Sequence, residues 1–137
     1  MRYSLFENQR NELILLARIL LMILFLITGW GKLTNFDGTV TYMSSLGAPL
    51  PMLAAGIAVV MEFFVAIVIV LGFYTRPLAF LYILFVLGTS LIGHHFWTMV
   101  DPERSANMIH FFKNISIMGG LLLLGITGPG KYSIDGR

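Results

Sequence analysis

The recurrence of long apolar runs limits the fold of this chain more than any other feature. Four such runs follow one another: residues 13–31, 51–72, 77–97 and 107–126. Each has about the 20 residues that an α-helix needs to cross the hydrocarbon core of a bilayer. In a bilayer only helices and closed barrels satisfy their own backbone groups, so these runs predict four membrane-spanning helices.

The connections between the runs are short, which places consecutive spans antiparallel. The segment 35–50 is too polar to span, but Asp37 can cap a short helix there and Gly47 can end it. The predicted fold is therefore an all-α, integral membrane, antiparallel four-helix bundle with a short interfacial helix, placed as a lid, between the first two spans. We expect residues 1–137 to form a single domain.

The composition excludes several function classes. Hydrophobic residues make up 57% of the chain and charged residues 12%, about half the charged share of a soluble domain. The absence of cysteine excludes dithiol chemistry, thiolate metal sites and iron–sulfur clusters carried by this chain alone. A net charge of +2 is too small and too scattered to predict nucleic-acid binding. The expected partner is the lipid bilayer.

Basic residues flank the predicted spans unequally. The side with both termini and the connection between the second and third spans carries five of them: Arg2, Arg10, Arg76, Lys131 and Arg137. The opposite side carries Lys32 and Arg104. Because cytoplasmic flanks are enriched in Lys and Arg, this count predicts a multi-pass protein with both termini in the cytoplasm.

Glu62 lies near the middle of the second run. An ionised side chain at this depth costs at least about 2.5–3.5 kcal/mol, so such groups normally face a bundle interior. Ala54, Ala58 and Ala66 recur with Glu62 at intervals of four residues, and small residues on one face let membrane helices approach closely. Glu62 is therefore predicted to point inward. It either forms a structural ion pair, with Lys32 or Lys113, or handles a proton or ligand.

Imidazoles occur at the end of the third run and in the fourth. His94 and His95 are adjacent, and adjacent residues of a helix diverge by about 100°. One of the two is expected to face the interior, and the pattern does not decide which. In the fourth run His110 and Asn114 share one stripe with Lys113 beside it.

Sorted by depth, these polar groups fall in the membrane half away from the termini. We predict that they line a polar pocket open to the periplasm, with the following candidate ligand-binding residues: Lys32, Glu62, His94, His95, His110, Lys113 and Asn114. Arg18 and Arg76 are predicted to be structural polar residues. No metal-binding residue is assigned, because the characteristic ligand spacings are missing.

Several stretches together carry a family resemblance: "LARI", "GWGKLTNFDGTVTYMSSLGAPLPMLAA", "VMEFFVAIVIVLGFYTRPLA", "LGTSLIGHHFW" and "NMIHFFKNISIMGGLLLL". The chain resembles the DoxX family, and within it the YphA-like branch of small bacterial inner-membrane proteins. The resemblance implies a four-helix protein of the inner membrane and a link to quinol-related redox biology. It marks these positions: Arg18, Lys32, Glu62, Arg76, His94, His95, Lys113 and Asn114.

The residues and the resemblance lead to three hypotheses. In the first, the pocket binds a quinone or another small apolar ligand, with His, Lys and Asn as donors and Glu62 or a His as proton relay. The chain has no complete redox centre, so another membrane subunit would have to supply one, and whether the chain is an enzyme stays open. In the second, it is a non-enzymatic accessory subunit of a larger complex or self-associates. In the third, it forms a small transporter or channel.

Overall fold

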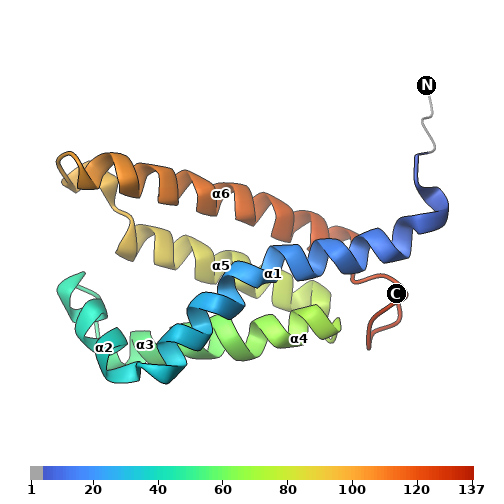
Figure 1. Ribbon diagram of the computed structural model, residues 1–137, viewed down its shortest axis with the longest axis horizontal. Helices are drawn as coiled ribbons and strands as arrows, with labels where there is room; N and C mark the ends of the chain where they lie inside the picture. Colours follow the sequence, from blue (N-terminus) through green and yellow to red (C-terminus); the bar gives the residue numbers. More distant parts are fainter. Residues whose placement is uncertain (1–4) are drawn as a thin grey trace.

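The computed structural model describes residues 5–137, and the regular structure within that range is helical (Figure 1). In chain order the elements are the following: η1 (Glu7–Gln9), α1 (Arg10–Thr34), α2 (Phe36–Ser45), α3 (Pro51–Val59), η2 (Val60–Val65), α4 (Ala66–Leu71), α5 (Thr75–Gly93), η3 (Phe96–Thr98) and α6 (Glu103–Thr127). The element η2 is π-helical and continues α3 into α4 without a break.

Four helical stretches of residues 5–137 are long and apolar enough to cross a membrane: Glu7–Thr34, Pro51–Leu71, Thr75–Thr98 and Glu103–Thr127. The predicted all-α fold with four spans is confirmed, and α2 is the short helix predicted between the first two. The start of α1 and the C-terminal segment lie at one end of the bundle, which we call the terminal end (Figure 1). Residues 35–50 and 94–102 lie at the other, which we call the loop end.

The bundle consists of two helical hairpins. In one, α1 packs along α3, η2 and α4; in the other, α5 packs along α6. The buried core lies where the hairpins meet and includes Met22 and Phe25 of α1, Tyr82 of α5 and Leu121 of α6. The rings of Phe25 and Tyr82 meet edge to face, with centroids 4.9 Å apart. This core holds the hairpins together in the middle, and the hairpins diverge toward the loop end (Figure 1).

The outward faces of the spans carry large apolar side chains. Leu20, Leu84 and Leu123, one from each of three spans, are all at least 60% exposed. In water such a surface would be costly, whereas lipid tails are as apolar as leucine. The exposed surface is therefore suited to a bilayer.

The α-helix of the third span is shorter than the predicted run 77–97. It stops at Gly93, and His94 has a non-helical backbone although its N–H still bonds to the carbonyl of Ser90 at 3.1 Å. The short 3₁₀ turn Phe96–Thr98 then leads to α6. Glycine weakens a helix, so this end is consistent with the local sequence. The two imidazoles thus lie in the connection, and helical periodicity does not set their directions.

Candidate functional site

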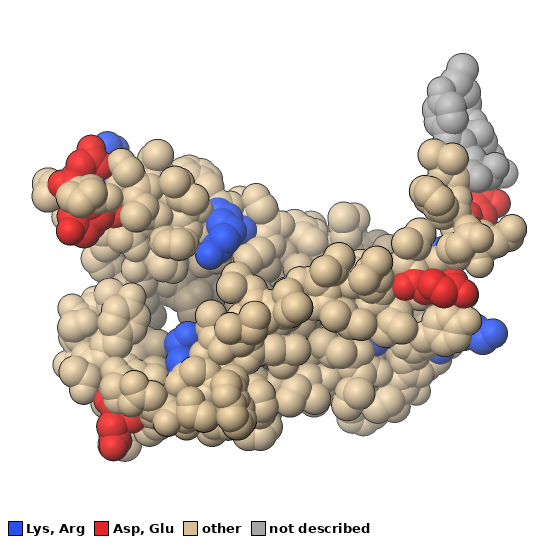
Figure 2. Space-filling view, viewed as in Figure 1, with Lys and Arg blue, Asp and Glu red and all other residues tan. Residues whose placement is uncertain are grey.

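A hollow opens between the two hairpins at the loop end. The helices α1 and α6 come close where Gly120 lies beside Leu21, since a Cβ on Gly120 would be 3.2 Å from the Leu21 side chain. From there toward the loop end the two helices diverge (Figure 1). Figure 2 shows the resulting hollow, with basic side chains on both sides of its mouth.

Helical geometry places Thr28 and Lys113 in this hollow. Residues seven apart lie on nearly the same face of a helix. Thr28 therefore shares a face with Leu21, and Lys113 shares one with Gly120, about 10 Å farther toward the loop end in each case. The face of α1 that bears Thr28 and Lys32 and the face of α6 that bears Lys113 thus line the same hollow from opposite sides.

The wall formed by α1 and η2 carries an ion pair. The ammonium of Lys32 lies 2.9 Å and 3.0 Å from the two carboxylate oxygens of Glu62. Thr28 donates a hydrogen bond of 2.7 Å to the same carboxylate. Glu62 is only 8% exposed, which confirms that it points inward, and its cationic partner is Lys32 rather than Lys113.

The π-helical turn η2 places Glu62 in position, and Gly29 is the residue that permits it. A Cβ on Gly29 would lie 2.6 Å from the carbonyl carbon of Glu62 and 2.7 Å from the amide nitrogen of Phe63. Both are backbone atoms, which cannot rotate away. The backbone of α1 therefore touches the backbone of the π turn directly, and π turns are frequent at functional sites.

The opposite wall carries a second polar cluster. The Nδ1 atom of His94 lies 2.9 Å from the Oδ1 atom of Asn107. The imidazoles of His94 and His110 are stacked at a tilt of 35°, with ring centroids 5.1 Å apart. The ammonium of Lys113 lies 3.3 Å from Nδ1 of His110. We call His94, His110 and Lys113 the imidazole–lysine cluster.

Two of the sequence-predicted residues lie outside both groups. The amide of Asn114 is buried and donates a 3.0 Å hydrogen bond to the Ser90 hydroxyl, which joins α6 to α5. His95 turns back to Thr98 in its own loop, at 2.8 Å. Of the two adjacent histidines, it is therefore His94 that faces α6.

Arg18 lies near the terminal end, far along α1 from Lys32. Its side chain is fully buried and donates to the carbonyls of Val70 at 2.8 Å and Ile69 at 3.4 Å, and also to the carbonyl of Tyr132. These carbonyls belong to the end of α4 and to the C-terminal segment. A guanidinium is well suited to satisfy helix-end carbonyls, which have no partner within their own helix.

Arg76 has a comparable position on α5, where it donates to carbonyls in the last turn of α6. Asp135 of the C-terminal segment accepts the N–H groups of Thr75 and Tyr74, each at 3.0 Å, at the start of α5. These backbone hydrogen bonds, the one from Thr75 first, lower the pKa of the Asp135 carboxyl below its usual range. The terminal end is thus closed by arginines and a carboxylate bound to the backbone.

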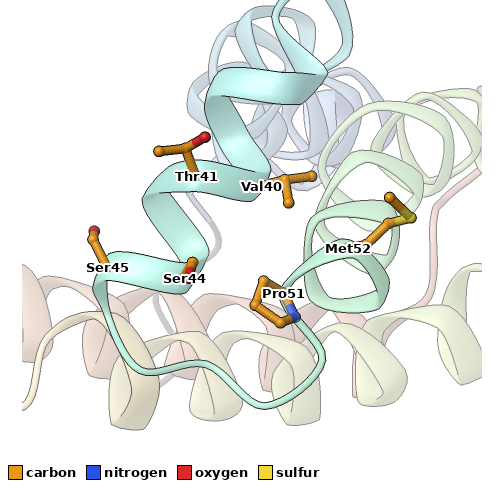
Figure 3. Close-up of a pocket in the computed structure, with 6 residues that line it drawn as sticks. All are labelled: Val40, Thr41, Ser44, Ser45, Pro51 and Met52. Carbon is orange, nitrogen blue, oxygen red and sulfur yellow. The ribbon is translucent and has the colours of Figure 1, made fainter.

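Two surface grooves lie near α2 and α3. One, of about 620 Å³, lies between α2 and the start of α3 and is lined by Val40, Thr41, Ser44, Ser45, Pro51 and Met52 (Figure 3). The other, of about 960 Å³, is almost wholly apolar and runs along α3 into η2, from Leu50 to Met61. Neither is lined by Glu62 or by the imidazole–lysine cluster. Within residues 5–137, no three His, Asp or Glu side chains gather closely enough to hold a metal ion.

Comparison with known proteins gives consistent matches. The DoxX family profile matches residues 13–95. The inner membrane protein YphA of Escherichia coli is 58% identical over 137 residues, which covers 100% of this chain and 98% of that protein. The inner membrane protein YqjF of the same organism is 43% identical over 122 residues, 89% of this chain and 88% of its own length.

A more distant match is the Surfeit locus protein 4 homolog of Schizosaccharomyces pombe. It is 30% identical over 131 residues, which cover 94% of this chain but 38% of that protein. No solved structure matches the chain significantly.

Proposed function

This chain belongs to the DoxX family, and on that premise we propose that it is an inner-membrane protein that binds a small, largely apolar ligand in the hollow at its loop end. The ligand class that best suits the walls carries hydrogen-bond acceptor oxygens, as a quinone head group does. The basic residues counted along the sequence favour an orientation with both termini in the cytoplasm. The hollow would then open toward the periplasm.

The observation that carries the proposal is the half-buried Lys32–Glu62 pair with its Thr28 hydrogen bond. Removing two charges from water is costly, and apolar residues of the same size would stabilise a bundle equally well or better. A pair held by a close-packed glycine and a π turn therefore suggests a use other than stability.

The donor set suits a quinone-like head group. The Lys32 ammonium has three N–H bonds and can donate to a ligand while it stays paired with Glu62. The Glu62 carboxylate can accept or return a proton beside a bound carbonyl oxygen. Without cysteine in the chain, we expect a partner subunit to supply any redox centre.

The test is to purify the protein with its surrounding lipid in polymer-bounded nanodiscs and to quantify extracted quinones by mass spectrometry. We expect about one quinone per chain above the bulk membrane ratio in the wild type, and loss of this enrichment in Glu62→Gln. Glu103→Gln, at the exposed start of α6, is the matched control and should retain it. Quinone at no more than the bulk membrane ratio in all three samples would exclude quinone binding, and equal enrichment in all three would exclude a role of Glu62 in it.

A second candidate function is that of an accessory subunit without a ligand. The observation that favours it is that the polar groups satisfy one another in pairs: Lys32 with Glu62, His94 with Asn107, and Asn114 with Ser90. In that case Glu62→Gln should reduce recovery of a co-purifying membrane protein and leave the lipid extract unchanged. The same nanodisc samples therefore distinguish the two functions.

A further inference from the structure

We propose that Lys113, oriented by His110, binds the phosphate group of a phospholipid from the leaflet at the loop end. This site lies on the α6 wall and does not depend on what binds beside Lys32 and Glu62. The inference rests on an unbalanced charge, on the donors that the cluster presents and on the apolar surface next to it.

The charge of Lys113 has no carboxylate to balance it. In the part of the chain that the structure describes, Lys32–Glu62 is the one salt bridge. Lys113 lies ten residues beyond Glu103, the start of α6, which is about 15 Å along the helix axis. An ammonium at this depth of a membrane span is costly unless an anion accompanies it. The two lysines at the hollow exceed the single carboxylate by one positive charge, so a monoanion would balance them.

The cluster presents donors suited to a tetrahedral anion. Lys113 directs one N–H toward Nδ1 of His110, which accepts it and so leaves the ring proton of the neutral imidazole on Nε2. The two remaining N–H bonds of the Lys113 ammonium are free to donate to a ligand. The two ring nitrogens point to opposite sides of the imidazole, so His110 orients the ammonium and Lys113, on an exposed face of α6, binds two oxygens of one phosphate.

The second imidazole holds the first in place. The Asn107 amide donates to the carbonyl of Glu103 at 2.9 Å, so its oxygen faces His94 and accepts the Nδ1 proton of that ring. His94 in turn stacks on His110. The orientation of the His110 ring is therefore fixed before any ligand arrives, which reduces the entropy that binding has to overcome.

The neighbouring surface favours a lipid as the source of the phosphate. Ile109 lies one turn from Lys113 and is 66% exposed. Phe112, which precedes Lys113 in the sequence, is 54% exposed. Acyl chains can lie along these side chains while the phosphate enters the hollow. A free phosphate ion would leave this apolar surface unused.

The experiment is native mass spectrometry of the full chain in detergent, titrated with dioctanoylphosphatidylglycerol. We expect a 1:1 complex that Lys113→Gln weakens about tenfold, that His110→Asn weakens less, and that Lys113→Arg retains. Arg104→Gln on the first turn of α6 and Lys131→Gln at the terminal end are the controls and should bind as the wild type does. Circular dichroism spectra confirm that each variant is folded.

Two further titrations show whether the bound phosphate belongs to a lipid or is a free ion. Dioctanoylglycerol, which lacks the phosphate, should not bind at the same concentration. If inorganic phosphate at the lipid's concentration displaces the lipid fully, the assignment to a phospholipid is overturned. Unchanged lipid binding by Lys113→Gln, or equal losses in Lys113→Gln and Arg104→Gln, would overturn the site itself.

Discussion

The helix α1 carries a cation toward each end of the bundle, and the two are used in opposite ways. Arg18, near the terminal end, is fully buried and donates only to backbone carbonyls. Lys32, near the loop end, is a quarter exposed and pairs with the carboxylate of Glu62 beside an open hollow. Both interactions join the first span to the second.

The acceptors explain the difference. A backbone carbonyl does not rotate away, so the acceptors of Arg18 stay in place. A carboxylate can take up a proton and can exchange one donor for another. The same helix therefore fastens the bundle at the terminal end and presents an exchangeable pair at the loop end.

The largest effect is expected from Arg18→Ala. It removes several hydrogen bonds from a charged donor and leaves buried carbonyls without partners, so the free energy of unfolding should fall by about 3–5 kcal/mol. Unfolding in mixed micelles with SDS, followed by circular dichroism, measures it. Arg10→Ala, on the exposed first turn of α1, should change little. A decrease of less than about 1 kcal/mol in the free energy of unfolding of Arg18→Ala would show that these hydrogen bonds do not stabilise the terminal end.

A smaller loss is expected from Gly29→Ala, because the new methyl group would overlap the backbone of Glu62 and Phe63. Overpacking of this kind costs about 1–3 kcal/mol, and the same unfolding assay detects it. Gly31→Ala is the matched control on the same helix, since a Cβ there meets nothing within 4 Å. Its stability should be unchanged or slightly raised. Equal effects of the two substitutions would show that α1 does not touch the π turn.

The coupling between Lys32 and Glu62 should be smaller still. In a double-mutant cycle of Lys32→Gln and Glu62→Gln we expect a coupling energy of about 1–2 kcal/mol, between the values for exposed and buried pairs. The unfolding assay in mixed micelles measures the stability of each variant in the cycle. A coupling energy as large as the stability loss in Arg18→Ala would remove the distinction between the two ends.

The smallest effect concerns Asp135. Its folded-state pKa lies below the unfolded value because the N–H groups of Thr75 and Tyr74 bind the charged form. Its contribution to stability is therefore complete above the ordinary Asp range, about pH 4, and is lost as the pH falls through the lower folded value. Asp135→Asn should flatten this acid limb of the stability curve. Asp37→Asn, at the loop end, should leave it unchanged.

The sequence predicts the large elements of this fold well. Four runs of apolar residues predict four spans, and the polar segment after the first run predicts α2. The stripe of alanines at intervals of four places Glu62 inward, because small residues mark the face where helices approach. These patterns succeed since membrane depth and helical periodicity are properties of local sequence.

Other parts depend on contacts between distant residues. Nothing in "VMEFFV" indicates a π turn, because the wider turn forms where α1 packs against it through Gly29. The directions of His94 and His95 follow from where α5 ends, which periodicity cannot supply. The route of the C-terminal segment across the bundle is likewise fixed by Arg18 and by the start of α5. A glycine three residues before Lys32 is the one local signal that could have pointed to the close approach.

The Arg18 hydrogen bonds also have a consequence for biosynthesis. A ribosome delivers Arg18 with the first helix, but the carbonyls of Ile69 and Val70 emerge 51 and 52 residues later, and that of Tyr132 only after 114. Until then the nascent helix carries a guanidinium that lipid does not solvate. The first helix is therefore expected to wait beside the translocon for the second, so that the two enter the bilayer as a pair and the last-made residues complete the seal.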